Sequence, residues 1–221
     1  MTQPQPQGYL ALPTRGSGPA VLVLHAWWGL NDTIKSVCDR LAQEGFVAFA
    51  PDLFHGKVAV TREEAQALSS GAEADGGKGV RAAAAAAAKF LAGHPGARGP
   101  GLGIVGFSFG VDYALMLAAD APDRVRAVVI FYGMGPGDHA RSKAAYLGHF
   151  AETDEFVPEA VVEELETALR AAGRPVTFHQ YKGTGHWFFE PDRPDAYQRR
   201  AAELAWGRTI AFLRGTLRGR P

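Results

Sequence analysis

The chain has 221 residues, of which 23 are basic and 23 are acidic, so its formal net charge is zero. That length suits one α/β domain with a substantial core, and the balanced charge gives no indication of a nucleic-acid partner or of an anionic membrane. The one cysteine, Cys38, excludes an internal disulfide and fits the reducing cytoplasm, where we expect it to be a small core residue.

The N-terminal segment, residues 1–8, is polar and rich in proline and glutamine, and we expect a loose tail there. It lacks the basic and apolar regions that define a signal peptide. The longest apolar stretch, residues 21–30, is much shorter than a membrane span and contains His25. The sequence therefore predicts a soluble, cytoplasmic protein without a membrane partner.

Short apolar runs alternate along the chain with longer helical stretches, which is typical of βαβ units around a mostly parallel sheet. Several of the runs are almost entirely apolar, as expected where helices cover both faces of a sheet. In chain order, we predict strands at 20–24, 47–50, 102–105, 125–131, 145–150 and 176–181, and helices at 32–44, 79–92, 109–119, 158–172 and 194–213.

The segment between residues 51 and 78 has a weaker pattern. Thr61 followed by Glu64 is typical of a capping box and predicts a helix over 61–70. Residues 69–79 are rich in glycine, alanine and serine, and we predict a mobile loop there, a possible lid. The chain has no evident repeat or interdomain linker, so residues 1–221 are expected to form a single domain.

The most informative motif is Gly-Phe-Ser-Phe-Gly at residues 106–110, between a predicted strand and a predicted helix. This context is that of a nucleophile elbow, a tight turn that lifts a serine oxygen off the edge of the sheet. Glycines leave room for the sharp backbone. The motif recurs by chance in proteins, and a serine that merely ends a strand is the alternative for Ser108. The strand–turn–helix context favours a nucleophile.

A nucleophilic serine needs a base and a residue that orients the base. His186 follows a predicted strand and a glycine loop, and its imidazole is suited to proton transfer near neutral pH. Asp154 lies before a predicted helix, where a carboxylate can hold the imidazole tautomer. Glu152 and Glu155 are the alternatives for that role. The chain order of serine, acid and histidine is the one found in α/β-hydrolases.

An acyl-transfer site also needs donors for the oxyanion of the tetrahedral intermediate. We predict the backbone N–H groups of Phe109, directly after the serine, and of Trp27, in the loop after the first predicted strand. Three residues beside the predicted oxyanion loop and the predicted base are candidates for the substrate pocket, although packing is the ordinary role of such side chains. They are His25, Trp28 and Trp187.

Four segments together resemble the dienelactone hydrolase family of α/β-hydrolases, and their order and spacing hold over nearly the whole chain. They are residues 25–31, 50–54, 105–110 and 185–189, with the stretch 154–158 also fitting. The resemblance implies the α/β-hydrolase fold, a three-layer sandwich with a mostly parallel central sheet. It implies hydrolysis of lactones or small esters through an acyl-enzyme, without a metal or organic cofactor. It places the catalytic triad on Ser108, Asp154 and His186.

Two linked positions depart from the pattern of this family. Dienelactone hydrolase itself has a cysteine at the elbow and a glutamate in the first loop that helps to activate it. This chain has Ser108 and Ala26 at the matching positions. The two changes belong together, because a serine relies directly on His186 and Asp154 and the activating glutamate loses its role.

A third departure concerns the substrate. Glu190 stands where the lactone-cleaving enzyme uses an arginine to hold the substrate carboxylate. A carboxylate repels an anionic substrate unless its loop turns away. Arg62 or Arg193 could replace that arginine, although a solvated surface position is the more ordinary role of each. The expected small-molecule substrate is therefore a neutral ester or lactone.

These observations predict a carboxylic-ester or lactone hydrolase. Other acyl chemistry on the same scaffold, such as that of a thioesterase, a peptidase or an acyltransferase, stays open because a fold does not fix a function. A catalytically silent ligand-binding module is a further alternative. Val111 favours it slightly, because relatives often have a second glycine there and a side chain could crowd the turn.

Overall fold

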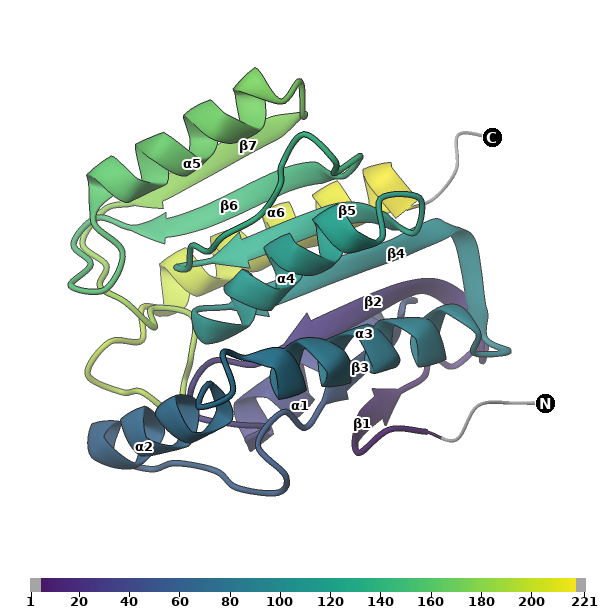
Figure 1. Cartoon of the computed structure of the whole chain (residues 1–221), viewed down its shortest axis with the longest axis horizontal. Coiled ribbons are helices and arrows are strands. Elements are labelled where there is room, and N and C mark those ends of the chain that lie inside the picture. Colours follow the sequence, from purple (N-terminus) through teal and green to yellow (C-terminus); the bar gives the residue numbers. More distant parts are fainter. Residues whose placement is uncertain (1–4, 218–221) are drawn as a thin grey trace.

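The computed structural model describes residues 5–217 as a seven-stranded sheet between two layers of helices (Figure 1). The strand order is β1-β3-β2-β4-β5-β6-β7. Only β1 is antiparallel to its neighbour, β3, and the other pairs are parallel. The strands are β1 (Gly8–Ala11), β2 (Gly18–Leu24), β3 (Val47–Pro51), β4 (Ala97–Phe107), β5 (Val125–Phe131), β6 (Ala145–Ala151) and β7 (Val176–Tyr181).

Two helices cover one face of the sheet and three cover the other. The helices are α1 (Asp32–Gln43), α2 (Arg62–Ala72), α3 (Lys78–Ala92), α4 (Phe109–Asp120), α5 (Glu159–Ala171) and α6 (Arg199–Leu217). Helices α1 and α6 pack on one side, whereas α3, α4 and α5 pack on the opposite side (Figure 1). The predicted three-layer sandwich with a mostly parallel sheet is thus confirmed. Within residues 5–217, no helix combines the length and the apolar composition that crossing a membrane requires.

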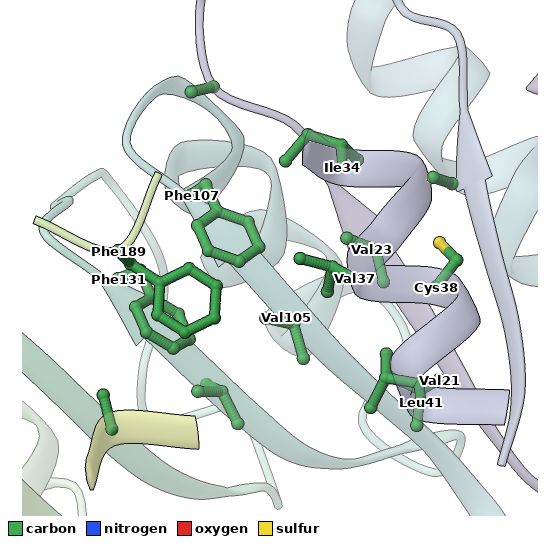
Figure 2. Packing of buried hydrophobic residues seen from close by; sticks show 14 of the residues in the cluster. Val21, Val23, Ile34, Val37, Cys38, Leu41, Val105, Phe107, Phe131 and Phe189 are labelled. Carbon is green, nitrogen blue, oxygen red and sulfur yellow. The ribbon is translucent and has the colours of Figure 1, made fainter. Parts of the chain in front are cut away.

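The apolar stripe of α1 shows how the sequence pattern builds this core. Ile34, Val37 and Leu41 recur at helical spacing and face the sheet, where strand β2 presents Val21 and Val23 to them (Figure 2). Cys38 is buried in the same cluster, as expected for a small core residue. Burial is the main cause that raises the pKa of its thiol, so the reactive thiolate is disfavoured.

Several boundaries differ from the sequence-based expectations. The predicted tail is shorter, because β1 begins at Gly8 and pairs with β3, while residues 1–4 lie outside the described residues. Strand β4 begins at Ala97, five residues earlier than predicted. The predicted loop at 69–79 is shortened to 73–77, since α2 continues to Ala72 and α3 begins at Lys78. Helix α6 begins at Arg199, five residues later than predicted, because the preceding segment folds back and the Gln198 N–H donates to the Phe188 carbonyl.

The parallel strands direct their carboxyl ends to one edge of the sheet. Strand β4 lies near the centre of the sheet, with Val105 opposite Val23 of β2 on one side and Val129 of β5 on the other. The loops that follow β2, β4, β6 and β7 therefore meet at this edge. They carry the residues from which the sequence predicts a catalytic site.

Candidate active site

Ser108 lies on a sharp turn between β4 and α4. Its backbone has φ 45° and ψ −114°, a conformation that residues other than glycine rarely adopt. The flanking glycines make this turn possible. A β-carbon on Gly110 would lie 2.4 Å from the Leu24 carbonyl oxygen, and one on Gly106 would lie 3.0 Å from the Val111 Cα. The strand–turn–helix context that the motif predicts is present.

Val111 does not crowd the turn, because a glycine just after the next strand, β5, makes room for it. Its side chain is fully buried. A β-carbon on Gly133 would lie 2.4 Å from the Val111 Cγ2 atom, so the bare backbone of Gly133 is what accommodates the valine. The valine that replaces a second glycine after the elbow is thus matched by a glycine that faces it.

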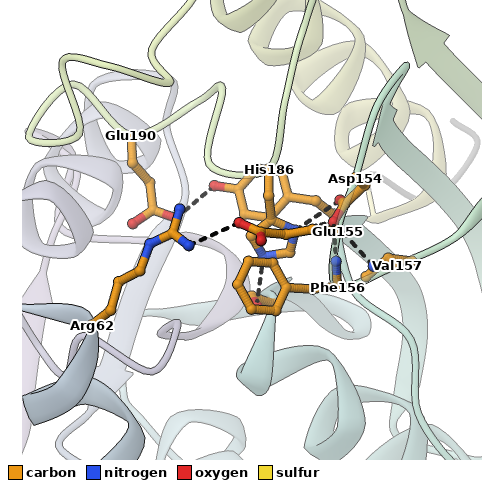
Figure 3. A network of polar contacts seen from close by, with 9 residues as sticks. Arg62, Asp154, Glu155, Phe156, Val157, His186 and Glu190 are labelled. Carbon is orange, nitrogen blue, oxygen red and sulfur yellow. Dashed lines mark hydrogen bonds and ion pairs between the residues drawn. The ribbon is translucent and has the colours of Figure 1, made fainter.

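Ser108, His186 and Asp154 form one continuous hydrogen-bonded chain. Figure 3 shows its His186–Asp154 part. The Ser108 Oγ lies 2.9 Å from the His186 Nε2, and the His186 Nδ1 lies 2.7 Å and 2.9 Å from the two Asp154 carboxylate oxygens. Because an ionised carboxylate only accepts hydrogen bonds, Nδ1 carries the proton and Nε2 is left to accept the serine hydroxyl. The His186 and Asp154 side chains are 3% and 4% exposed, which keeps this contact largely away from solvent.

The loop after β6 fixes the Asp154 carboxylate from behind. Its Oδ1 atom accepts the backbone N–H groups of Phe156 at 2.9 Å and Val157 at 3.0 Å. This is a local turn in which an aspartate side chain bonds the backbone two and three residues further on. The carboxylate is therefore already oriented before it accepts the His186 N–H.

The two alternative acids do not contact His186. Glu152 accepts the Gly183 backbone N–H at 2.8 Å, which ties the β6 loop to the β7 loop. Glu155 points outward and forms an ion pair with Arg62 of α2 at 2.9 Å (Figure 3). Of the three acids that the sequence offers, the structure brings only Asp154 to the imidazole.

Aromatic rings enclose the His186 imidazole on several sides. The rings of Tyr132, Phe156 and Trp187 each have their centroids 4.9 Å from the imidazole centroid. Tyr132, which sequence reasoning missed, follows β5 at the carboxyl edge of the sheet and has an unusual positive φ of 37°. Its place directly after a buried apolar strand is the signal that could have identified it.

Tyr132 in turn binds Glu190, the residue that departs from the family's pattern. The Tyr132 hydroxyl donates to the Glu190 Oε1 at 2.8 Å, and Glu190 is fully buried. Burial raises the pKa of this carboxyl to about 8, so it is mainly protonated at neutral pH. The carboxyl is turned inward behind His186, and it therefore presents no surface charge to a substrate.

The residues of the two predicted oxyanion donors, Trp27 and Phe109, line one cavity with Ser108. Phe109 is the first residue of α4, so its N–H points out of the helix N-terminus, where the helix dipole favours negative charge. Trp27 lies in the loop after β2 and lines the same cavity as Ser108 and Phe109. Neither backbone N–H has an acceptor among residues 5–217.

His25, predicted as a pocket residue, is instead buried between two loops and contacts their backbone. It is fully buried, and its Nε2 accepts the Leu53 backbone N–H at 3.2 Å. Its Nδ1 therefore donates to the Ala26 carbonyl at 2.7 Å. Burial lowers the pKa of this imidazole to about 4, so it is neutral. His25 joins the loops after β2 and β3, and it does not line either cavity beside His186.

Two cavities adjoin His186 and Trp187. The smaller one, about 150 Å³, contains Ser108. The larger one, about 570 Å³, is bordered by Trp28 and by both candidate arginines. Arg193 lies 3.8 Å above the Trp28 ring, and Arg62 lies 4.9 Å above the Trp187 ring. A third cavity of about 680 Å³ lies between the end of α3 and the start of β4, and none of these site residues lines it.

Known proteins resemble this chain over nearly its whole length. A model of the "Dienelactone hydrolase family" matches residues 7–217. The chain is 36% identical to "Protein usf" of Aquifex pyrophilus, with 94% of this chain and 92% of that protein covered. It is 33% identical to a protein of Aquifex aeolicus named "Putative carboxymethylenebutenolidase", with 96% and 94% covered.

Solved structures lead to the same family. The crystal structure of a "Putative Dienelactone Hydrolase" from Klebsiella pneumoniae matches with a TM-score of 0.72 and 27% identity, over 93% of this chain and 91% of that one. The arrangement of sheet and helices is accordingly the α/β-hydrolase fold, as predicted. On its sequence and its structure alike, this chain belongs to the dienelactone hydrolase family.

Proposed function

We propose that this hydrolase cleaves a small carboxylic ester or lactone through an acyl-enzyme formed on Ser108. The observation that carries the proposal is the chain of contacts from the Ser108 Oγ to the His186 Nε2 at 2.9 Å and from the His186 Nδ1 to Asp154 at 2.7 Å. A serine hydroxyl is a weak nucleophile at its ordinary pKa, and an adjacent oriented imidazole is the usual means of activating it.

In the proposed reaction, the Ser108 oxygen attacks the carbonyl carbon while His186 accepts its proton at Nε2. Asp154 stabilises the imidazolium that forms. The backbone N–H groups of Trp27 and Phe109 stabilise the oxyanion of the tetrahedral intermediate. His186 then protonates the leaving alkoxide, and the acyl group stays on the serine. A water molecule, deprotonated by His186, attacks that ester and releases the acid and Ser108.

The cavities support a small substrate. A volume of about 150 Å³ beside Ser108 is comparable with a protein cavity that holds benzene. The relative in Aquifex aeolicus is named "Putative carboxymethylenebutenolidase", which supports an ester or lactone as the substrate here. Glu190 stands where the lactone-cleaving enzyme has its substrate-binding arginine, and it is buried, so this position offers no positive charge to an anionic substrate.

Steady-state hydrolysis of p-nitrophenyl acetate by Ser108→Ala and His186→Ala tests the proposal. Each change should lower kcat by roughly 10⁴-fold or more, because the nucleophile and its base act as one unit. Ser70→Ala, on the exposed side of α2, is the matched control and should leave kcat unchanged. Near-normal turnover by a folded Ser108→Ala protein would overturn the proposal.

A further inference from the structure

The cavity that contains Ser108 has aromatic walls. The rings of Trp27 and Trp187 are stacked with their centroids 5.9 Å apart, and Phe156 lies 5.6 Å from the first and 5.2 Å from the second. All three side chains line the cavity. Aromatic faces arranged around a small space are a recurrent means of holding an ammonium group, because the negative face of each ring attracts a cation.

A cation already lies on this aromatic cluster from outside the cavity. The Arg62 guanidinium lies 4.9 Å from the Trp187 ring centroid and 5.9 Å from that of Phe156. Its charge is balanced by Glu155 at 2.9 Å. The rings thus accept a positive charge in the folded protein, and the Arg62–Glu155 pair leaves little net charge beside them.

Part of the cavity lining is polar and acidic. It consists of Gln66 and Ser69 of α2 and of Glu73, the residue that caps the C-terminus of this helix. Among residues 5–217, no lysine or arginine lines this cavity. The C-terminus of a helix carries a partial negative charge, which adds to that of the Glu73 carboxylate. This part of the lining therefore favours a cation or a hydrogen-bond donor.

Helix α4 contacts the Glu73 carboxylate through one side chain, and the charge of Glu73 shifts the pKa of another. The Tyr113 hydroxyl donates to the Glu73 Oε1 at 3.3 Å. Asp112, on the first turn of α4, has its pKa raised to about 7 by burial and by the negative charge of Glu73. Phe109, at the N-terminus of α4, also lines the cavity, and a helix N-terminus favours negative charge. The lining of the cavity thus offers a group that stabilises an anion and a group that stabilises a cation.

We propose that the substrate of this site is a small ester or lactone that carries an ammonium group, and that Glu73 is the residue that selects it. The inference rests on the proposed ester hydrolysis at Ser108. In this proposal, the carbonyl oxygen of the substrate lies at the α4 N-terminus and its ammonium group lies between the aromatic walls and Glu73. The cavity has a volume of about 150 Å³, which limits the part of the substrate inside it to about the size of benzene.

Three acetate esters of matched size test this proposal. They are acetylcholine, its uncharged isostere 3,3-dimethylbutyl acetate, and the anion 4-acetoxybutanoate. We expect kcat/KM for acetylcholine to exceed that for the uncharged isostere by about fivefold or more, the effect of one charge contact near 4 Å in water. The anion should be the poorest substrate. The preference should weaken as salt is added, because the carboxylate is exposed.

Glu73→Gln should bring the ratio of kcat/KM for acetylcholine to kcat/KM for the uncharged isostere close to one. Glu63→Gln removes the same charge from the exposed first turn of α2, outside the cavity, and should keep the wild-type ratio. Equal rates for acetylcholine and its isostere in the wild type would overturn the inference, and so would an unchanged ratio in Glu73→Gln. A protein that hydrolyses none of the three esters would instead contradict the proposed function.

Discussion

The buried carboxyl of Glu190 should make this protein less stable in alkaline solution. Its pKa is raised from 4.5 to about 8, with burial as the main cause. The folded state therefore binds this proton more tightly than the unfolded state does. The free energy of unfolding consequently falls as pH rises from about 4.5 through about 8. Above that range the whole of the stability that depends on this proton is lost.

The size of the effect follows from the two pKa values. A difference of about 3.5 in pKa corresponds to a limit of about 5 kcal/mol. Between pH 5 and pH 9 the contribution of Glu190 should change by about 4 kcal/mol, because part of the transition lies outside this interval. Glu190→Gln has the same shape, accepts the same Tyr132 hydroxyl and carries no titrating proton. It should therefore remove this pH dependence.

Urea unfolding at a series of pH values measures the effect. The free energy of unfolding of Glu190→Gln should equal that of the wild type near pH 5 and exceed it by about 4 kcal/mol at pH 9. Glu164→Gln, an exposed position on α5, is the matched control and should follow the wild type throughout. Parallel pH profiles for Glu190→Gln and the wild type would show that the carboxyl is not a buried neutral group, and the reasoning would fail.

Three further changes probe the orienting acid, the elbow and a helix cap. Asp154→Asn should lower kcat on the order of 10⁴-fold without unfolding the protein, because the tautomer control of His186 is lost; steady-state kinetics with near-normal kcat would assign that role elsewhere. Gly110→Ala should abolish activity and destabilise the fold, since its β-carbon would lie 2.4 Å from a carbonyl oxygen, whereas Gly207→Ala on α6 meets nothing within 4 Å and should be tolerated. Thr61→Ala should cost about 1 kcal/mol in urea unfolding, because it removes the capping box of α2; an unchanged midpoint would contradict that role.

Strands β5 and β6 lie inside the sheet and were predictable because their sequence is mainly apolar; β5 has the predicted bounds, and β6 extends one residue further. The edge strand β7 also has the predicted bounds. Strand β1 was missed because it has four residues at the sheet edge, where one neighbouring strand is enough and the apolar pattern is short. The predicted loop at 69–79 is shortened to residues 73–77, because the helix that the Thr61 capping box starts continues to Ala72 and α3 begins at Lys78.

The candidate site was predictable where residues belong to recognisable motifs. The elbow fixes Ser108 by its own glycines, and the glycine loop after a predicted strand indicates His186. The contact of Tyr132 with Glu190 has no such motif and depends on the loop after β7 folding back on the sheet. The approach of Glu73 to the cavity of Ser108 likewise depends on how α2 packs, and neither residue belongs to a motif.

The most direct test of the account is covalent labelling with a fluorophosphonate, which reacts with activated serines. Intact-mass measurement and peptide mapping should give a single adduct on Ser108. The adduct should be lost in His186→Ala, because the imidazole that activates the serine is absent. A folded wild-type protein that forms no adduct, or that forms it on another serine, would contradict the claim that Ser108 and His186 make a working nucleophile.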